Sequence, residues 1–334
     1  MSAPPVIDIH AHYYPESYMR VLAQHGYPYG TVYSNVSPAD AEAPGATSYK
    51  RADSAFTDLG ERIAAMDRQG VAMQALSMPS PWVFWKDSEL ATALARAYND
   101  AASAAHVAHP GRLIGLVTLP MHDPNLALTE LERAARLPGM RGVGLGTHAA
   151  GRELSDRMFF PVYERIAALG LPIFLHYAPL TVIGGNDRLK PFHLHNLIGN
   201  GVETAIAAAH FVFGGVLDAF PTLEVCLPHA GGVLPILIGR WDQGHRVRSE
   251  CRHLPHPPSY YLRRFTYDTV SHSDAVMEFL VKLVGAERIM LGSDYCFDMG
   301  YERPVELVRR LAVLNDQQRE QILGTTAARL LRVA

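Results

Sequence analysis

The stretch VIDIHAH, residues 6–12, is a short apolar run that ends in two histidines. We predict a β-strand over residues 6–10 that leads into His10 and His12. Side chains two positions apart on a strand face the same side, so these two imidazoles can bind one ion together. A lone His-x-His is more often one packed and one solvated histidine. The pair therefore indicates a metal site only if other strands also end in metal-binding side chains.

Short apolar runs recur along the chain and alternate with longer amphipathic segments. The predicted strands are residues 6–10, 72–78, 113–119, 140–145, 172–176, 223–227, 265–267 and 289–291. The predicted helices between them are residues 58–69, 88–109, 125–137, 159–169, 202–213, 234–246, 274–284 and 304–314. This alternation predicts βαβ units and a parallel sheet. Eight units can close a (β/α)8 TIM barrel, although a doubly wound α/β sheet would show the same alternation.

Ionisable side chains stand at four of these strand ends. Besides His10 and His12, His176 ends the fifth strand, His229 follows the sixth and Asp294 follows the eighth. The carboxyl ends of barrel strands meet at one mouth, where active sites are built. Gathering these groups in a packed core without a ligand would be costly. We therefore predict a barrel with a metal site made of His10, His12, His176 and Asp294.

Three imidazoles and a carboxylate suit Zn²⁺, with water in the open position of a catalytic site, and Mn²⁺, Fe²⁺ or Co²⁺ would also fit. The strand at residues 140–145 has no lysine that could be carboxylated to bridge two ions. We therefore expect one divalent ion. His229 could be a fifth ligand, but a general acid/base beside the ion is the more plausible role.

The chain of 334 residues exceeds the ~250 of a simple barrel, and barrels of this size are routinely one domain. We expect a single domain over residues 1–334. Residues 13–57, rich in Pro, Gly, Tyr and Ser, follow the first strand and form a lid-like insertion in this prediction. Residues 178–200 follow the fifth strand and would line the pocket. An extra C-terminal helix, residues 316–331, is expected to pack outside the barrel.

Composition excludes several classes of function. The net charge of −3 provides no basic field for nucleic acid. No stretch reaches the roughly 18 apolar residues of a membrane span, and the first residues do not resemble a signal peptide. The cysteines Cys226, Cys251 and Cys296 are sparse and widely spaced, which favours a reducing compartment. We expect a cytoplasmic protein that binds neither nucleic acid nor membrane.

The motifs HAH at residues 10–12, LPHAGG at 227–232 and LGSDY at 291–295, together with His176, resemble the amidohydrolase superfamily. The likeness lies in its amidohydrolase 2 branch, near the aminocarboxymuconate semialdehyde decarboxylase group, and runs from Ile7 to about Arg329. It implies a (β/α)8 barrel, one divalent metal, no organic cofactor and non-oxidative decarboxylation. By matched position, His10, His12, His176 and Asp294 are the metal ligands and His229 is the acid/base.

The resemblance also implies two substrate-binding arginines and a homodimer. Arg51, in the first long segment, matches an arginine that binds substrate carboxylate, and Lys50 is one residue away. Arg240 matches an arginine that reaches the site of the neighbouring subunit. Taken by themselves, Arg51 could grip a carboxylate with two hydrogen bonds or be a solvated loop charge. Arg240 on a helix would ordinarily form a surface salt bridge.

Two enzyme activities remain open from the sequence. The first is a lyase that removes CO2 from an unsaturated or aromatic carboxylic acid. The second is a hydrolase of an amide, lactone or carbon–carbon bond at the same metal, with His229 or Asp294 moving protons. A non-catalytic metal-binding barrel is the weakest alternative, because every acid/base position is occupied.

Overall fold

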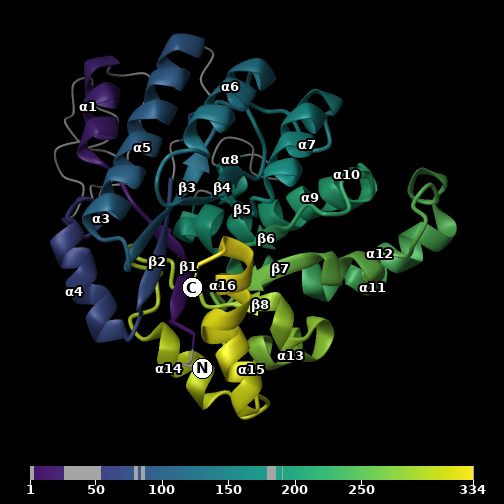
Figure 1. The fold of residues 1–334 in the computed structure, drawn as a ribbon. Helices are drawn as coiled ribbons and strands as arrows, with labels where there is room; N and C mark the ends of the chain where they lie inside the picture. The colour runs from purple at the N-terminus through teal and green to yellow at the C-terminus, as the bar shows by residue number, and fades with distance from the viewer. Residues whose placement is uncertain are drawn as a thin grey trace.

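The computed structural model describes residues 4–25, 54–78, 82–83, 87–178, 186–189 and 191–333. Eight parallel strands form one sheet in sequence order, and helices surround it (Figure 1). The strands are β1 (Ile7–His12), β2 (Met73–Ser77), β3 (Leu113–Thr118), β4 (Met140–Gly146), β5 (Ile173–His176), β6 (Val225–Leu227), β7 (Phe265–Asp268) and β8 (Ile289–Met290).

The helices that follow the strands agree closely with the predicted segments. They are α4 (Leu59–Gln69), α5 (Ser88–Ala108), α6 (Pro124–Ala134), α7 (Phe160–Leu169), α9 (Asn200–Phe213), α11 (Leu234–Val247), α13 (Asp274–Val284) and α14 (Pro304–Arg310). The first three begin at an aspartate whose side chain accepts backbone N–H bonds: Asp58, Asp87 and Asp123. Such caps satisfy the open donors of a helix start and fix where each helix begins.

The two edges of the sheet meet, so the predicted barrel is confirmed. The Ile9 N–H donates to the Leu291 carbonyl at 2.9 Å, and Ala11 pairs in parallel with Tyr295 just beyond β8. A doubly wound sheet would instead reverse its strand order at a switch point. The regular order from β1 to β8 excludes that alternative.

The C-terminal helical segment lies against the barrel interior, which corrects the prediction that it packs outside. It consists of α15 (Asp316–Glu320), a π-helical turn (Gln321–Thr325) and α16 (Thr326–Leu331). Leu330 and Leu331 of α16 join the interior cluster that contains Ile7 and Ile9 of β1. Figure 1 shows α16, in yellow, in front of the barrel. Apolar side chains on this last helix therefore seal the end where β1 begins.

The long insertions are described only in part. Residues 13–57 include α1 (Glu16–His25) and α3 (Ser54–Thr57), and the rest of the proposed lid, with Lys50 and Arg51, lies outside the described residues. The segment after β5 includes α8 (Asn186–Leu189). A short helix, α10 (Val216–Ala219), follows α9, and α12 (Pro258–Tyr261) lies with α11 on an arm that projects from the barrel (Figure 1).

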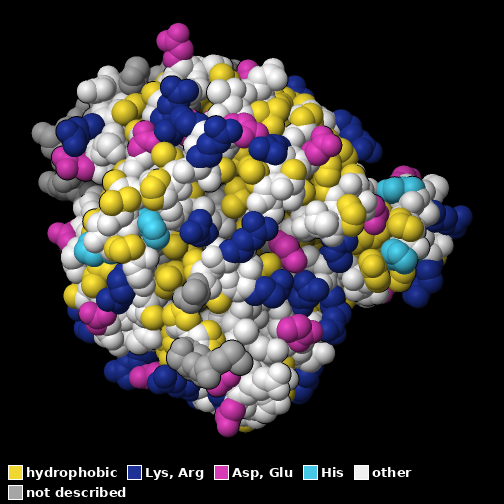
Figure 2. Space-filling view, viewed as in Figure 1, with side chains coloured by type: hydrophobic (Ala, Val, Ile, Leu, Met, Phe, Trp, Pro, Cys, Tyr) yellow, Lys and Arg dark blue, Asp and Glu magenta, His cyan; other side chains and the backbone are white. Residues whose placement is uncertain are grey.

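Basic and acidic side chains are interspersed across the face in Figure 2. Within the described part of the chain, no helix combines the length and apolar character that crossing a membrane requires. Cys226, Cys251 and Cys296, all in the described part of the chain, form no disulfide.

Candidate metal centre

The two histidines of β1 converge, as their spacing predicts. The Nε2 atoms of His10 and His12 lie 3.2 Å apart. The pairing of β1 with β2 shifts register between Asp8 and Ala11. Such irregularities often re-aim side chains beside active sites. The end of β1 is thus shaped to bring both imidazoles to one point.

His176 from the end of β5 and Asp294 from the segment after β8 complete a group of four. Each of His10, His12, His176 and Asp294 offers one ligand atom, and these atoms all lie within 4.8 Å of one another. Asp294 Oδ1 is 3.0 Å from His12 Nε2 and 3.3 Å from His10 Nε2. The His176 ring centre is 4.4 Å from that of His12.

The four side chains fit one divalent ion. His176 Nδ1 is buried and has no hydrogen-bond partner among the described residues. An orphaned nitrogen beside two other imidazoles and a carboxylate is costly unless a ligand is present. Imidazole and carboxylate are also the donors that Zn²⁺ and related ions take. The group is therefore suited to binding one metal ion.

Burial controls the charges of this group. It lowers the pKa of His12 to about 4, against the opposing effect of Asp294, and lowers that of His176 well below its usual range. Burial also acts to lower the pKa of His10, but Asp294 and Asp268 outweigh it and raise the value to about 10. Burial would raise the pKa of Asp294, yet His10, His12 and His229 hold it well below normal. One anionic carboxylate thus faces mostly neutral imidazoles.

Ser77 on β2 fixes the orientation of His12. The Ser77 hydroxyl donates to the Ala11 carbonyl at 3.0 Å, so its oxygen is free to accept from His12 Nδ1, also at 3.0 Å. With its proton on Nδ1, the His12 ring presents the Nε2 lone pair to the group. A partner on the second nitrogen is the usual way in which a protein orients a metal-binding histidine.

Asp8, two residues before His10, holds β1 to the segment after β8. Its carboxylate accepts from Ser293 N at 3.0 Å, from Ser293 Oγ at 2.6 Å and from His10 N at 3.1 Å. Gln74 donates to it at 2.9 Å and accepts in turn from the buried Arg62. Because Ser293 directly precedes Asp294, this network fixes the backbone on both sides of the ligand group. The sequence reasoning missed it.

His229 lies in the turn after β6 and faces the group from the side. Its Nε2 is 3.7 Å from Asp294 Oδ2, and its ring centre is 5.2 Å from that of His10. Its Nδ1 is buried without a partner among the described residues. This placement allows His229 to exchange a proton with a molecule bound beside Asp294.

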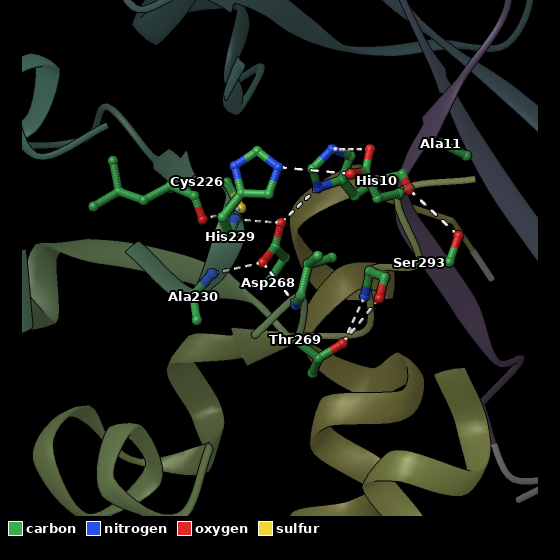
Figure 3. Close-up of polar contacts among 12 residues, drawn as sticks. His10, Ala11, Cys226, His229, Ala230, Asp268, Thr269 and Ser293 are labelled. Carbon is green, nitrogen blue, oxygen red and sulfur yellow. Dashed lines mark hydrogen bonds and ion pairs between the residues drawn. The ribbon is translucent and has the colours of Figure 1, made fainter. Parts of the chain in front are cut away.

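Asp268, the last residue of β7, is the second functional carboxylate that the sequence reasoning missed. Its Oδ2 accepts from His10 Nδ1 at 2.6 Å, and the side chain is fully buried. Figure 3 shows it between the His10 ring and the backbone of His229 and Ala230. The available signal was its position at the end of a strand. The seventh strand was predicted to stop one residue earlier, at Tyr267.

Of the two arginines predicted to bind substrate, the structure describes Arg240 but not Arg51. Arg240 is exposed on α11, and among the described contacts it has none with the metal group. Arg51 lies outside the described residues. The substrate-binding role of Arg51 and the cross-subunit role of Arg240 stay predictions.

A small cavity of about 20 Å³ adjoins the metal group. Its lining includes His10 and His176 together with the apolar side chains of Trp82, Leu116 and Phe174. The Trp82 indole N–H donates to the Tyr177 carbonyl at 3.0 Å, which holds the ring near His176. The metal group therefore borders a largely apolar wall.

Comparison with known proteins places the chain in a family. Residues 7–333 match the family model described as amidohydrolase. The 2-amino-3-carboxymuconate-6-semialdehyde decarboxylase of Dictyostelium discoideum is 30% identical over 97% of this chain and 91% of its own length. The γ-resorcylate decarboxylase of a Polaromonas strain is 29% identical over 71% of this chain and 76% of its own.

A solved structure agrees with these sequence relatives. The 5-carboxyvanillate decarboxylase of Sphingomonas paucimobilis is 27% identical, with a TM-score of 0.82 over the whole of both chains. The family model covers nearly the full length, including every residue of the four-membered metal group. The chain belongs to the amidohydrolase family.

Proposed function

We propose that this protein is a metal-dependent decarboxylase that removes CO2, without oxidation, from an unsaturated or aromatic carboxylic acid. The observation that carries the proposal is the group of His10, His12, His176 and Asp294 with His229 beside it, 3.7 Å from Asp294. The three similar proteins named above are decarboxylases of three different acids, so the shared feature is the reaction and not the substrate.

In this proposal the four-residue group holds one divalent ion, Zn²⁺ in the first instance, with Mn²⁺, Fe²⁺ or Co²⁺ as alternatives. When bound, the ion supplies positive charge that orients the substrate and stabilises the negative charge that builds up on it. No organic cofactor is needed. Asp8 and Ser77 keep the ligands in place before substrate arrives, so little rearrangement is required during turnover.

His229 delivers the proton in the proposed reaction. The bond between the substrate carbon and its carboxylate breaks, CO2 leaves, and the electron pair stays on that carbon. The imidazolium of His229 then gives its proton to the carbon, and a new carbon–hydrogen bond forms. Asp294 Oδ2, 3.7 Å from His229 Nε2, stabilises the protonated ring and so shares in the proton transfer.

The roles of the two arginines and the homodimer in this proposal rest on the family resemblance. Arg51 binds a carboxylate of the small substrate, and Arg240, exposed on α11, reaches the site of a second copy in a homodimer. Residues 1–334 form one catalytic domain, with residues 13–57 as its lid. The free cysteines suit a cytoplasmic setting.

A substrate panel tests this function. Metal-loaded protein is incubated with carboxylated phenols and with carboxymuconate semialdehydes, and CO2 release is measured separately from ring-opened or hydrolysed products. We expect CO2 from at least one acid, and none after the ion is removed with a chelator. Turnover of an amide, ester or lactone without CO2 would favour the hydrolase instead. Full activity of metal-free protein would overturn the site itself.

A further inference from the structure

Asp268 has four hydrogen-bond donors around one fully buried carboxylate (Figure 3). Its Oδ2 accepts from His10 Nδ1 at 2.6 Å and from the His229 N–H at 3.0 Å. Its Oδ1 accepts from the Ala230 N–H at 2.8 Å and the Val270 N–H at 3.0 Å. Each oxygen therefore serves two donors. One side chain bonds the ring of a metal-group histidine and the backbone that carries the proposed proton donor.

The turn that carries His229 has a backbone that suits an anion. His229 and Ala230 have φ values of 53° and 54°, in the left-handed region that side chains other than glycine rarely adopt. Consecutive residues in such turns direct their N–H groups to one point and form an anion-binding concavity. The carboxylate of Asp268 occupies that point. Its charge thus stabilises an unfavourable backbone that sets where the His229 ring lies.

The neighbouring glycines leave this turn little room to move. A Cβ on Gly232 would lie 2.1 Å from the Gly201 carbonyl oxygen, and one on Gly292 would lie 2.9 Å from the Asp268 Cβ. β1, β7 and the segment after β8 therefore approach one another closely around Asp268. A shift of this carboxylate would be transmitted to its partners and not absorbed by empty space.

The same carboxylate selects the tautomer of His10. Because Nδ1 donates to Asp268, the neutral ring that binds a metal carries its lone pair on Nε2, which lies 3.3 Å from Asp294 Oδ1, inside the metal group. A ring with its proton on Nε2 could not serve as a ligand there. Asp268 thus acts on the metal group through one partner and on His229 through another.

We propose that Asp268 is a positioning residue that couples the metal ligand His10 to the proton donor His229. This inference rests on the proposed function of His229. Asn in its place would keep the volume but offer one acceptor oxygen and one NH2 group. In either orientation, the NH2 would face two N–H donors: those of His10 and His229, or those of Ala230 and Val270. The coupling therefore requires a carboxylate.

The test compares Asp268→Asn with Asp8→Asn. Both carboxylates are fully buried and both accept a hydrogen bond from His10. Asp268 bonds the imidazole ring of His10, whereas Asp8 bonds the backbone N–H of His10. Zinc affinity is measured by competition with a chromophoric chelator, and the His229 imidazole is followed by NMR in zinc-loaded protein. For Asp268→Asn we expect zinc affinity to fall about 10–100-fold and the His229 signals to shift. Asp8→Asn should leave the His229 signals unchanged.

Activity measurements distinguish the effect of Asp268 on the metal ligand His10 from its effect on the proton donor His229. At saturating zinc, kcat of Asp268→Asn should stay below wild type with little change in KM. A double variant with His229→Asn should be no slower than His229→Asn alone. Recovery of wild-type kcat at saturating zinc, with unmoved His229 signals, would overturn the coupling. Unchanged zinc affinity would overturn the part that acts through His10.

A second variant covers the case in which Asn prevents folding. In Asp268→Ala, formate should restore zinc affinity and the His229 signals, whereas uncharged formamide should not. Equal rescue by both, or by neither, would contradict a role for the carboxylate charge. If wild-type protein releases CO2 from no acid, the proposed function fails, while the zinc and NMR measurements still decide the role of Asp268.

Discussion

The two sides of the metal group are built differently. On the side of β1 and β8, His10, His12 and Asp294 have partners for their polar atoms: Asp268, Ser77 and one another. On the side of β5 and β6, the Nδ1 atoms of His176 and His229 are buried without a partner among the described residues. The first side is satisfied in the protein alone, and the second is not.

This difference assigns the two sides separate tasks. A satisfied network is rigid and keeps its geometry without a ligand, which suits the residues that hold an ion. Unsatisfied buried nitrogens are stabilised only when something binds, which suits the side where His176 completes the ligand set and His229 meets substrate. The metal-holding side also buries two further carboxylates, Asp8 and Asp268, whereas the open side borders the apolar wall formed by Trp82 and Phe174.

The largest expected effect comes from breaking the satisfied side at a ligand. His12→Gln should lose the ion and reduce CO2 release to background. The loss in metal affinity should exceed the about 10–100-fold typical of partners outside the ligand set. Metal content after dialysis and CO2 release from the best acid of the panel measure it. A variant that keeps one ion per chain would show that His12 is not a ligand.

Changing the open side should separate activity from metal content. His229→Asn removes the proton donor, and general acid/base groups contribute about 10²–10⁴-fold to rate. We expect that loss in kcat with one ion still bound per chain. Loss of the ion in this variant would instead make His229 a fifth ligand and erase the difference between the two sides.

Changing Asp8, which supports the satisfied side, should lower the stability of the protein more than its catalytic rate. In Asp8→Asn the new NH2 group faces donors in either orientation: the N–H groups of Ser293 and His10, or the Gln74 NH2 beside the Ser293 hydroxyl. A buried donor without an acceptor costs about 1–3 kcal/mol, so the denaturant midpoint of the metal-free protein should fall accordingly. Chemical denaturation of both proteins measures this. An unchanged midpoint would mean that Asp8 does not fix these backbones.

The smallest effect concerns acid stability on the open side. His148, after β4, donates from Nε2 to the Ala178 carbonyl at 3.1 Å and accepts at Nδ1 from the Gly151 N–H at 3.4 Å. A second proton would face that N–H, and burial lowers the pKa of His148 below its ordinary 6.5. The unfolded chain then takes up the proton first. The stability due to neutral His148 is complete above pH 6.5 and is lost as the pH falls below it.

A matched variant isolates this effect. His148→Gln keeps a donor and an acceptor but does not titrate. Between pH 7.5 and 5, wild-type protein should therefore lose slightly more free energy of unfolding than the variant, as measured by urea denaturation at each pH. Equal losses in the two proteins would exclude His148 as a source of acid sensitivity.

Much of this site could be predicted from the sequence, because each ligand is marked locally. His10, His12, His176 and Asp294 are ionisable residues at the ends of apolar runs, and barrel topology brings strand ends together. Asp8 and Asp268, the carboxylates that orient the ligands, have no such local signal in the sequence for the residues that they contact. His10 and Asp268 are 258 residues apart in sequence, and Asp8 and Ser293 are 285 apart. Only the closed barrel shows that they touch.

The placement of the C-terminal helix illustrates the same limit. Its apolar side chains correctly predicted a packed face, but the surface predicted to receive it, the outside of the barrel, was wrong. Leu330 and Leu331 pack with Ile7 at the start of β1, a contact across nearly the whole chain. Local patterning can identify a buried face, whereas the identity of its partner follows from topology.

The most direct test of the metal site is an anomalous difference map from crystals grown with Zn²⁺, collected at the zinc edge. We predict one strong peak per chain, about 2.0–2.2 Å from a nitrogen of each of the three histidines and from a carboxylate oxygen of Asp294. His229 should lie outside that distance. A peak elsewhere, a second peak beside the first, or no peak at this group would contradict the account.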